Sequence, residues 1–132
     1  MLQLAEEYRK ASDLLRKQGR KGKPLSRAPW RLVAIHAIEL FLNAFLLEAK
    51  HTPSCIRGMQ HNLSKRTTLA VKDGLRLRKK TKYHLLQLDE RREYLAARYE
   101  TTDAKALSQL NRLTQSLEEV AKKVSAKIKT AP

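Results

Sequence analysis

The chain has 132 residues, which is enough for one hydrophobic core and too few for two. Its 28 Lys and Arg outnumber its 13 Asp and Glu, giving a formal net charge of +15, and this excess predicts a polyanionic partner, foremost a nucleic acid. The single cysteine, Cys55, excludes an intrachain disulfide and indicates a cytoplasmic protein, while the apolar run at residues 32–47 is shorter than the about 20 residues of a membrane-spanning helix, so no membrane association is expected.

The first predicted helix covers residues 2–18, where apolar side chains recur at helical spacing on one face. Two glycines and a proline within residues 19–24 end it. Such breakers are few, and Leu, Ala, Lys, Arg and Glu abound, so the composition predicts an all-α fold. We expect one up-and-down bundle of four to five helices over residues 1–129, followed by a short flexible tail at residues 130–132.

The second helix is expected to follow Ser26 as its N-cap, to hold Pro29 in its first turn and to end near Lys50. This segment is apolar almost all round at helical pitch, which predicts the central helix of the domain. His36, Glu39 and Asn43 interrupt it, and their offsets place them along one narrow stripe. Because buried polar groups need partners, this polar stripe is either a structural network or the edge of a site.

Three further helices complete the expected bundle. The third covers residues 54–73, bent near Gly58 and ended by Gly74, and the fourth covers residues 78–100. The fifth is capped by residues 102–103 and carries leucines and valines every three or four residues. Short connections between long helices favour antiparallel neighbours.

Basic residues concentrate in two connections of the expected bundle. In an up-and-down bundle the first-to-second and third-to-fourth connections lie at the same end, so the two clusters are expected to converge on one basic pole that binds nucleic acid. The members of this predicted basic pole are Arg16, Lys17, Arg20, Lys21, Lys23, Arg76, Arg78, Lys79, Lys80 and Lys82.

The same topology places the start of the third helix and the end of the fourth at the opposite pole. If the polar stripe runs toward that pole, it forms a ligand-binding crevice with the residues there. The members of the crevice are then Glu39, Asn43, His61, Arg98 and Tyr99. In the structural alternative, Arg98 pairs with Glu39 and His61 caps a helix.

Arg57 and His61 are the candidate catalytic residues, because an Arg close to a His suits metal-independent RNA cleavage. The His moves a proton at the ribose 2′-oxygen or the leaving oxygen, while the Arg stabilises the phosphorane charge. The alternative is a solvent-exposed Arg beside a helix-capping His. His36 and Glu39 lack the second Glu/His pair that a carboxylate-bridged metal centre needs, so neither a metal nor another cofactor is expected.

Residues 68–86 offer a different reading, a DNA-reading helix-turn-helix, because an LAxxxGL pattern precedes a basic helix. Against it, Lys80 and Lys82 fall where the second helix of that motif has buried aliphatic residues. A DNA-binding regulator stays open as a hypothesis, as does a purely structural dimerisation domain.

Four segments carry a resemblance to a known family. The first two are AEEYRKASDLL at residues 5–15 and HAIELFLNAFLL at residues 36–47. The others are HNLSKRTTLAVKDGL at residues 61–75 and YLAARYE at residues 94–100. In their order and spacing they resemble the first four helices of the HEPN family, the helical domain of prokaryotic toxin and nucleotidyltransferase-associated proteins.

This resemblance implies a helical bundle, frequently a homodimer, that binds nucleotide or RNA and has a nucleotidyltransferase or an antitoxin as partner. Catalytic members are metal-independent endoribonucleases whose Arg and His are more widely spaced than Arg57 and His61. No His follows Arg98, so a complete ribonuclease motif is absent. We therefore expect a nucleotide- or RNA-binding module of a toxin–antitoxin or defence-type system. The alternative is an endoribonuclease toxin that uses Arg57 and His61.

Overall fold

The computed structural model describes residues 1–91 and 103–129, the side chains of 24, 89–91 and 103–109 excepted. Within these ranges the protein is all-α and has no strand, which confirms the predicted fold class. A short 3₁₀ helix, η1, precedes the second α-helix. The elements are α1 (Leu2–Arg16), η1 (Pro24–Arg27), α2 (Ala28–Glu48), α3 (Pro53–Gly58), α4 (Leu63–Lys72), α5 (Lys79–Arg91) and α7 (Asp103–Lys129).

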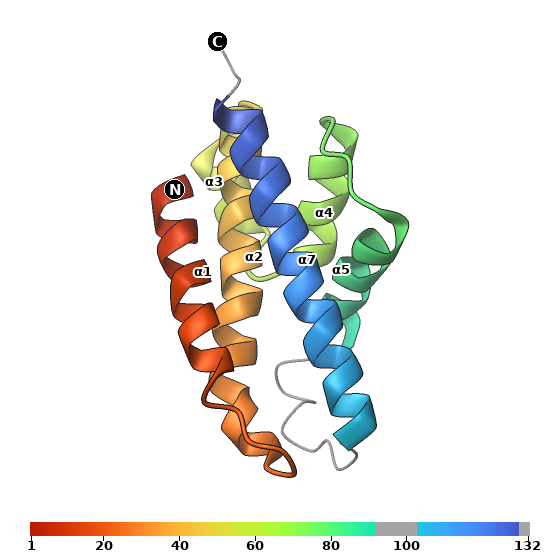
Figure 1. Ribbon diagram of the computed structural model, residues 1–132. Coiled ribbons are helices and arrows are strands. Elements are labelled where there is room, and N and C mark those ends of the chain that lie inside the picture. Colours follow the sequence, from red (N-terminus) through yellow and green to blue (C-terminus); the bar gives the residue numbers. More distant parts are fainter. Residues whose placement is uncertain (92–102, 130–132) are drawn as a thin grey trace.

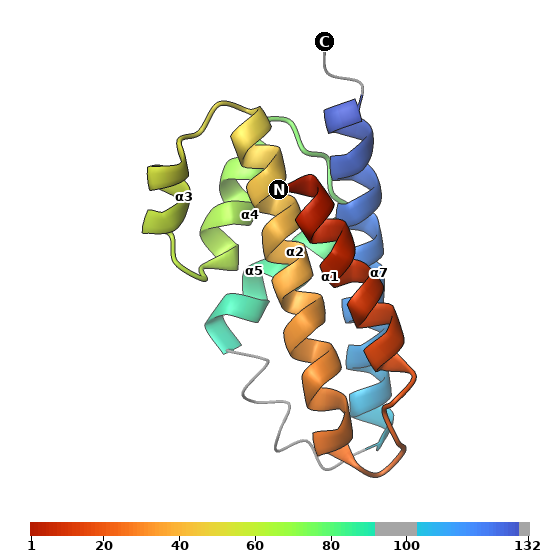
Figure 2. The same cartoon turned by 90° about the vertical axis from the view of Figure 1, so that its left-hand side faces the viewer.

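Helix α2 is the central helix of the bundle, as predicted, with α1, α4 and α7 packed around it (Figures 1 and 2). The side chains of Ala34, Ile38 and Phe41 are completely buried. By length and composition the segment Leu25–Glu48 is apolar enough to cross a membrane, but 72% of its most apolar window is buried inside the protein. Its apolar surface is therefore used in packing.

The connection between α1 and α2 differs from the prediction at Ser26. No side-chain hydrogen bond caps α2, whose N-cap position is occupied by Arg27. The Ser26 hydroxyl instead accepts a hydrogen bond from the Arg20 N–H at 2.8 Å and donates one to the Lys23 carbonyl at 2.6 Å. The predicted cap was wrong because the Ser26 hydroxyl binds backbone groups of the α1–α2 connection instead of an N–H group of α2.

The single helix predicted over residues 54–73 is two helices, α3 and α4, separated by a reversal of the chain. The Thr52 side chain caps α3 by accepting from the Cys55 N–H at 3.0 Å, and Asn62 caps α4 by accepting from the Lys65 N–H at 2.9 Å. Between them Gln60 has a φ of 50°, in the left-handed region. The chain therefore turns back where only a bend was expected.

This reversal brings the end of α4 beside the end of α2. Gly74 ends α4 as predicted, with a φ of 108° and a hydrogen bond from the Leu75 N–H to the Ala70 carbonyl at 2.9 Å. His51 Nε2 lies 2.6 Å from Asp73 Oδ2 and joins the two helix ends. The α4–α5 connection consequently starts at the end of the bundle opposite the α1–α2 connection (Figure 1).

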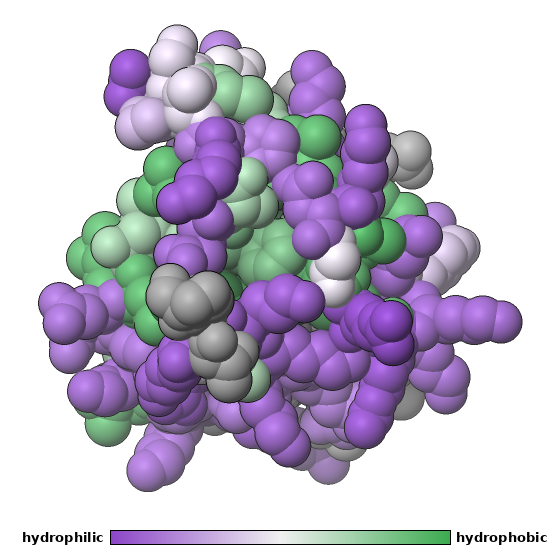
Figure 3. Space-filling model, turned by 90° about the horizontal axis from the view of Figure 1, so that it is seen from above, coloured by the Kyte–Doolittle hydropathy of each residue, from purple (hydrophilic) through white to green (hydrophobic). Residues whose placement is uncertain are grey.

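The two basic clusters therefore do not converge on one pole, and that prediction was wrong. The first cluster, residues 16–23, surrounds the α1–α2 connection, whereas the second, residues 76–82, follows α4 onto the flank of α5. The unexpected reversal between α3 and α4 inverts the direction of every later helix. Seen from the end where α7 stops, the surface is largely hydrophilic, with hydrophobic residues showing between the hydrophilic ones (Figure 3).

Glu119 of α7 holds the first turn of α5. One of its carboxylate oxygens accepts from the Arg78 N–H at 2.7 Å, and the other accepts from the Thr81 hydroxyl at 2.6 Å. Lys123 donates to it at 2.9 Å. Burial alone raises the pKa of Glu119, but the hydrogen bonds from Thr81, Arg78 and Lys123 and the Lys123 charge outweigh it and lower this pKa.

We expect Glu119→Gln to destabilise the protein at neutral pH and much less in acid. A carboxylate with a lowered folded-state pKa stabilises the fold above its unfolded-state pKa of about 4.3, and that contribution is lost as the pH falls through the folded pKa. Urea titrations of both proteins from about pH 7 to about pH 3 measure the difference in the free energy of unfolding. Glu118→Gln, at a neighbouring exposed carboxylate, is the control, and a Glu119→Gln difference that stays constant with pH would contradict this account.

Candidate functional site

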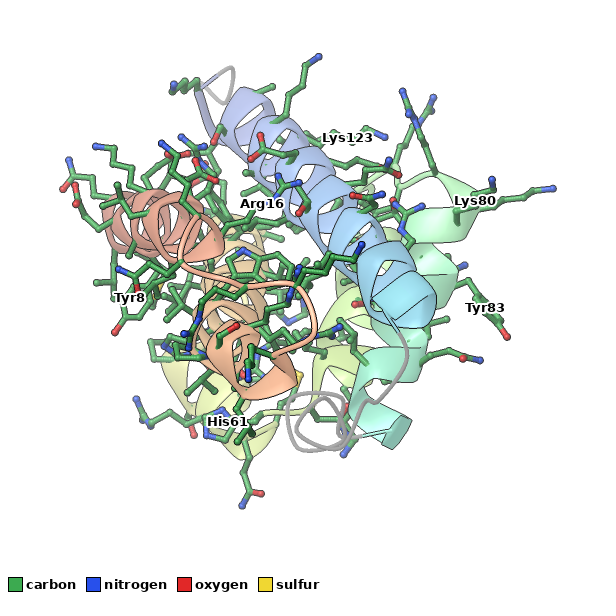
Figure 4. The ribbon with its side chains drawn as sticks, turned by 60° about the horizontal axis from the view of Figure 1, so that its bottom comes forward. Tyr8, Arg16, His61, Lys80, Tyr83 and Lys123 are labelled. Carbon is green, nitrogen blue, oxygen red and sulfur yellow. The ribbon has the colours of Figure 1, made fainter. Side chains whose placement is uncertain are left out.

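A cleft of about 870 Å³ opens beside the polar stripe of α2. Its walls come from α2, the turn at residues 59–62 and the start of α4, with Tyr8 of α1 and Leu88 of α5 at its margins. Figure 4 shows Tyr8 and His61 on the same side of the molecule. The polar side chains among its lining residues include His36, Glu39, Gln60, His61, Asn62 and Lys65.

Glu39 is the buried acid of this cleft, with only 7% of its surface exposed. Its Oε1 lies 3.1 Å from His61 Nδ1, and its Oε2 lies 3.4 Å from His36 Nδ1. Because a carboxylate only accepts hydrogen bonds, His61 donates through Nδ1–H. When Nδ1 carries the hydrogen of a neutral imidazole, Nε2 is the hydrogen-bond acceptor. The His61 side chain is 85% exposed, so a ligand can reach it.

The turn that carries His61 is fixed by its own backbone and by a buried neighbour. The Asn62 N–H donates to the Met59 carbonyl at 2.9 Å, and the Met59 side chain is buried. His61 therefore stands one residue before the N-cap of α4. The structural alternative in which His61 caps this helix is wrong, because Asn62 does so.

Behind Glu39 lies a buried guanidinium that the sequence interpretation missed. Arg66 of α4 is 2% exposed, and its Nε donates to Asn43 Oδ1 at 2.6 Å. Its terminal nitrogens donate to the carbonyls of Asn62 and Ile56, both at 3.3 Å, and one lies 3.9 Å from Glu39. This arginine joins the carboxyl end of α3, the start of α4 and the polar stripe of α2.

The ring of His36 packs edge-on against Tyr8 of α1. Their ring centroids are 4.8 Å apart and the ring planes meet at 73°, a favourable geometry for aromatic pairs. This contact and the Glu39 carboxylate hold the His36 ring from two sides. The cleft thereby gains two aromatic rings next to its buried acid.

The predicted site residues are only partly brought together. Glu39 and His61 meet in the cleft, while Asn43 faces Arg66 behind it. Arg57 is exposed on α3 and is not among the described residues that line the cleft. Arg98 and Tyr99, and with them the proposed pairing of Arg98 with Glu39, lie outside the described residues.

Neither a metal-binding cluster nor a similar known protein indicates the function of the described part of the chain. No group of three or more His, Cys, Asp or Glu that could hold a metal ion occurs among the residues that the structure describes. Comparisons with protein-family models, curated proteins and solved structures found no match. The function is therefore argued from the site itself.

The segment at residues 68–86 has a geometry unlike that of a DNA-reading helix-turn-helix. A connection of residues 73–78 separates α4 from α5, whereas that motif has a turn of about three or four residues. Glu119 also occupies the start of α5, the part that would contact bases. The first turn of α5 is therefore held against α7 and is not free to enter a groove.

Proposed function

We propose that this chain binds a nucleotide or a short segment of RNA in the cleft beside Glu39, as a HEPN-like module of a toxin–antitoxin or defence-type system. The observation that carries the proposal is the buried Glu39 with His36 and His61 on its two oxygens, at the floor of an open cleft. The sequence resemblance supports the same ligand class. It also supports a homodimer and a nucleotidyltransferase or antitoxin as partner.

The size and chemistry of the cleft suit a ribonucleotide. Its volume of about 870 Å³ lies within the range of small-molecule sites, and Leu32, Val33 and Met59 supply apolar wall for a base. The exposed Lys65 at its margin suits a phosphate, and His61 Nε2 can accept from a hydroxyl of the ribose. The Glu39 carboxylate is an acceptor for N–H groups of a base or hydroxyls of a ribose.

Replacing His61 with Ala is expected to weaken nucleotide binding about tenfold or more, because it removes an exposed imidazole that the Glu39 carboxylate holds at the cleft. Isothermal titration with each common ribonucleoside monophosphate measures the affinity. His51→Gln is the matched control, since His51 lies beyond the end of α2 and is not among the described residues that line the cleft. If the wild-type protein and His61→Ala bound nucleotide with equal affinity, the proposal that this cleft is the binding site would be wrong.

A second candidate function is metal-independent RNA cleavage with His61 as the proton-transferring group. The observation that favours it is the Glu39–His61 hydrogen bond at 3.1 Å, which orients the imidazole and leaves Nε2 for the ribose 2′-hydroxyl. Cleavage would give a 2′,3′-cyclic phosphate and a free 5′-hydroxyl. An RNA cleavage assay in chelator tests it, and cleavage that survives His61→Ala would exclude His61 as the catalytic residue.

A further inference from the structure

A second cleft, of about 640 Å³, lies between the start of α5 and the middle of α7. Figure 4 shows Lys80 and Tyr83 of α5 on the side of the molecule opposite Tyr8 and His61. Helices far apart in the sequence build this α5–α7 cleft. Its charged lining residues are Arg78, Lys79, Lys80, Arg112, Glu118, Glu119, Lys122 and Lys123.

The carboxylates of the α5–α7 cleft are already engaged. Glu119 accepts hydrogen bonds from Thr81, Lys123 and the backbone of Arg78, and Glu118 lies 3.7 Å from Arg9. Four exposed cations of the cleft form no ion pair with any residue in the described part of the chain. These are Arg78, Lys79, Lys80 and Lys122.

The Arg112 side chain in the α5–α7 cleft is held by two buried hydroxyl groups. Arg112 donates from one terminal nitrogen to the Thr81 hydroxyl at 2.8 Å and from Nε to the Ser116 hydroxyl at 3.3 Å. Thr81 and Ser116 are completely buried. A guanidinium held by two buried hydroxyls therefore stands among exposed lysine side chains, an arrangement suited to successive phosphates of a strand.

An aromatic side chain accompanies these cations. Tyr83 is 64% exposed, and it lies three and four residues after Lys80 and Lys79 on α5, so all three share one face. In Figure 4 the side chains of Lys80 and Tyr83 extend outward from the same side of α5. An exposed ring beside a basic groove is the combination with which proteins hold unpaired bases.

We propose that the α5–α7 cleft binds single-stranded nucleic acid, with its phosphates on the cleft cations and a base stacked on Tyr83. The start of α5 is not itself the anion site, because the Glu119 carboxylate already binds the Arg78 N–H just before this helix and the Thr81 hydroxyl in its first turn. The proposal rests on residues of α5 and α7 alone and holds whether or not the Glu39 cleft takes a nucleotide. A duplex, whose bases are paired, gains only the phosphate contacts.

The test is the anisotropy of a fluorescein-labelled oligouridylate of about ten nucleotides, titrated at several salt concentrations. Combining Lys79→Gln, Lys80→Gln and Lys122→Gln is expected to lower the salt slope of the affinity by about 2, since each phosphate contact on a single strand contributes about 0.7. Lys10→Gln, Lys50→Gln and Lys72→Gln together remove the same charge elsewhere and are expected to change the slope little. Equal effects of the two triple variants would overturn the proposal in favour of a non-specific charge effect.

Tyr83→Ala isolates the stacking contribution. We expect at least a fivefold loss of affinity for the oligouridylate, by the order of magnitude of one base–aromatic stack, with an unchanged salt slope and recovery in Tyr83→Phe. Affinity for a duplex of equal length should not change. No loss in Tyr83→Ala, or an equal loss for the duplex, would overturn the proposal.

Discussion

Replacing Arg66 with Met is expected to lower the free energy of unfolding by about 3 kcal/mol. The guanidinium is almost completely buried and donates to Asn43 Oδ1 and to the carbonyls of Ile56 and Asn62. Methionine fills much of the volume but donates nothing, so buried acceptors lose their partner, and the buried Glu39 carboxylate loses a nearby positive charge. Urea denaturation followed by circular dichroism measures the loss.

Lys65→Met is the matched control for this substitution. Lys65 is the preceding residue of α4, is exposed, and loses the same charge on mutation to the same residue. We expect its effect to stay within about 0.5 kcal/mol. If the two variants were equally stable, the hydrogen bonds of Arg66 would contribute nothing, and the assignment of this residue as the link between α2, α3 and α4 would be lost.

Replacing Phe41 with Ala is expected to lower the free energy of unfolding by about 4 kcal/mol. Phe41 is completely buried in α2, the helix against which α1, α4 and α7 pack. The loss combines the transfer of an aromatic side chain with a cavity that neighbouring helices only partly fill. In thermal unfolding the Tm should fall by roughly 15 °C, given about 4 °C per kcal/mol for a chain of this size.

Leu32→Ala, on the same helix, is the control for Phe41→Ala. Leu32 is 55% exposed, so its truncation removes little buried area and should cost less than about 1 kcal/mol. If Leu32→Ala and Phe41→Ala lowered the free energy of unfolding by similar amounts, the difference in burial between these two positions of α2 would be wrong.

Periodicity alone was sufficient to predict the central helix and its polar stripe. An apolar helix with Glu39 and Asn43 on one line must bury both, and both are buried. The expected topology brought His61 and Glu39 into one crevice on the condition that the stripe runs toward that pole; the two residues do meet, although the reversal between α3 and α4 was not part of that topology. Which partners satisfy the stripe depends on how α4 is seated against α2, and that contact is not encoded in the pattern of either helix alone.

The reversal between α3 and α4 was missed because its signals are local and polar. The sequence prediction explained the change of direction within residues 54–73 by a bend at Gly58. In the structure a Cβ at position 58 would meet no atom within 4 Å, so no close contact there requires a glycine. The decisive residues are the caps Thr52 and Asn62 and the left-handed Gln60. Glutamine rarely marks such a turn, since glycine or asparagine is usual there.

Arg66 could have been found from the sequence. Leu63, Thr67 and Ala70 define the buried face of α4, and position 66 falls on that face at helical spacing. A basic residue on such a face must reach an acceptor, and the acidic and amide groups of α2 were the available candidates. Arg66 was not recognised because it is one of 28 Lys and Arg residues in the chain, most of which were expected to be exposed.

The bond between Arg66 and Asn43 also selects one alignment of α4 along α2. Apolar contacts between leucine-rich helices are non-directional, so several sliding positions of α4 bury comparable area. A slide of one helical turn, about 5.4 Å, would carry the guanidinium out of reach of the amide and leave both groups desolvated without a partner. The polar stripe thus penalises misaligned packings that a purely aliphatic interface would tolerate.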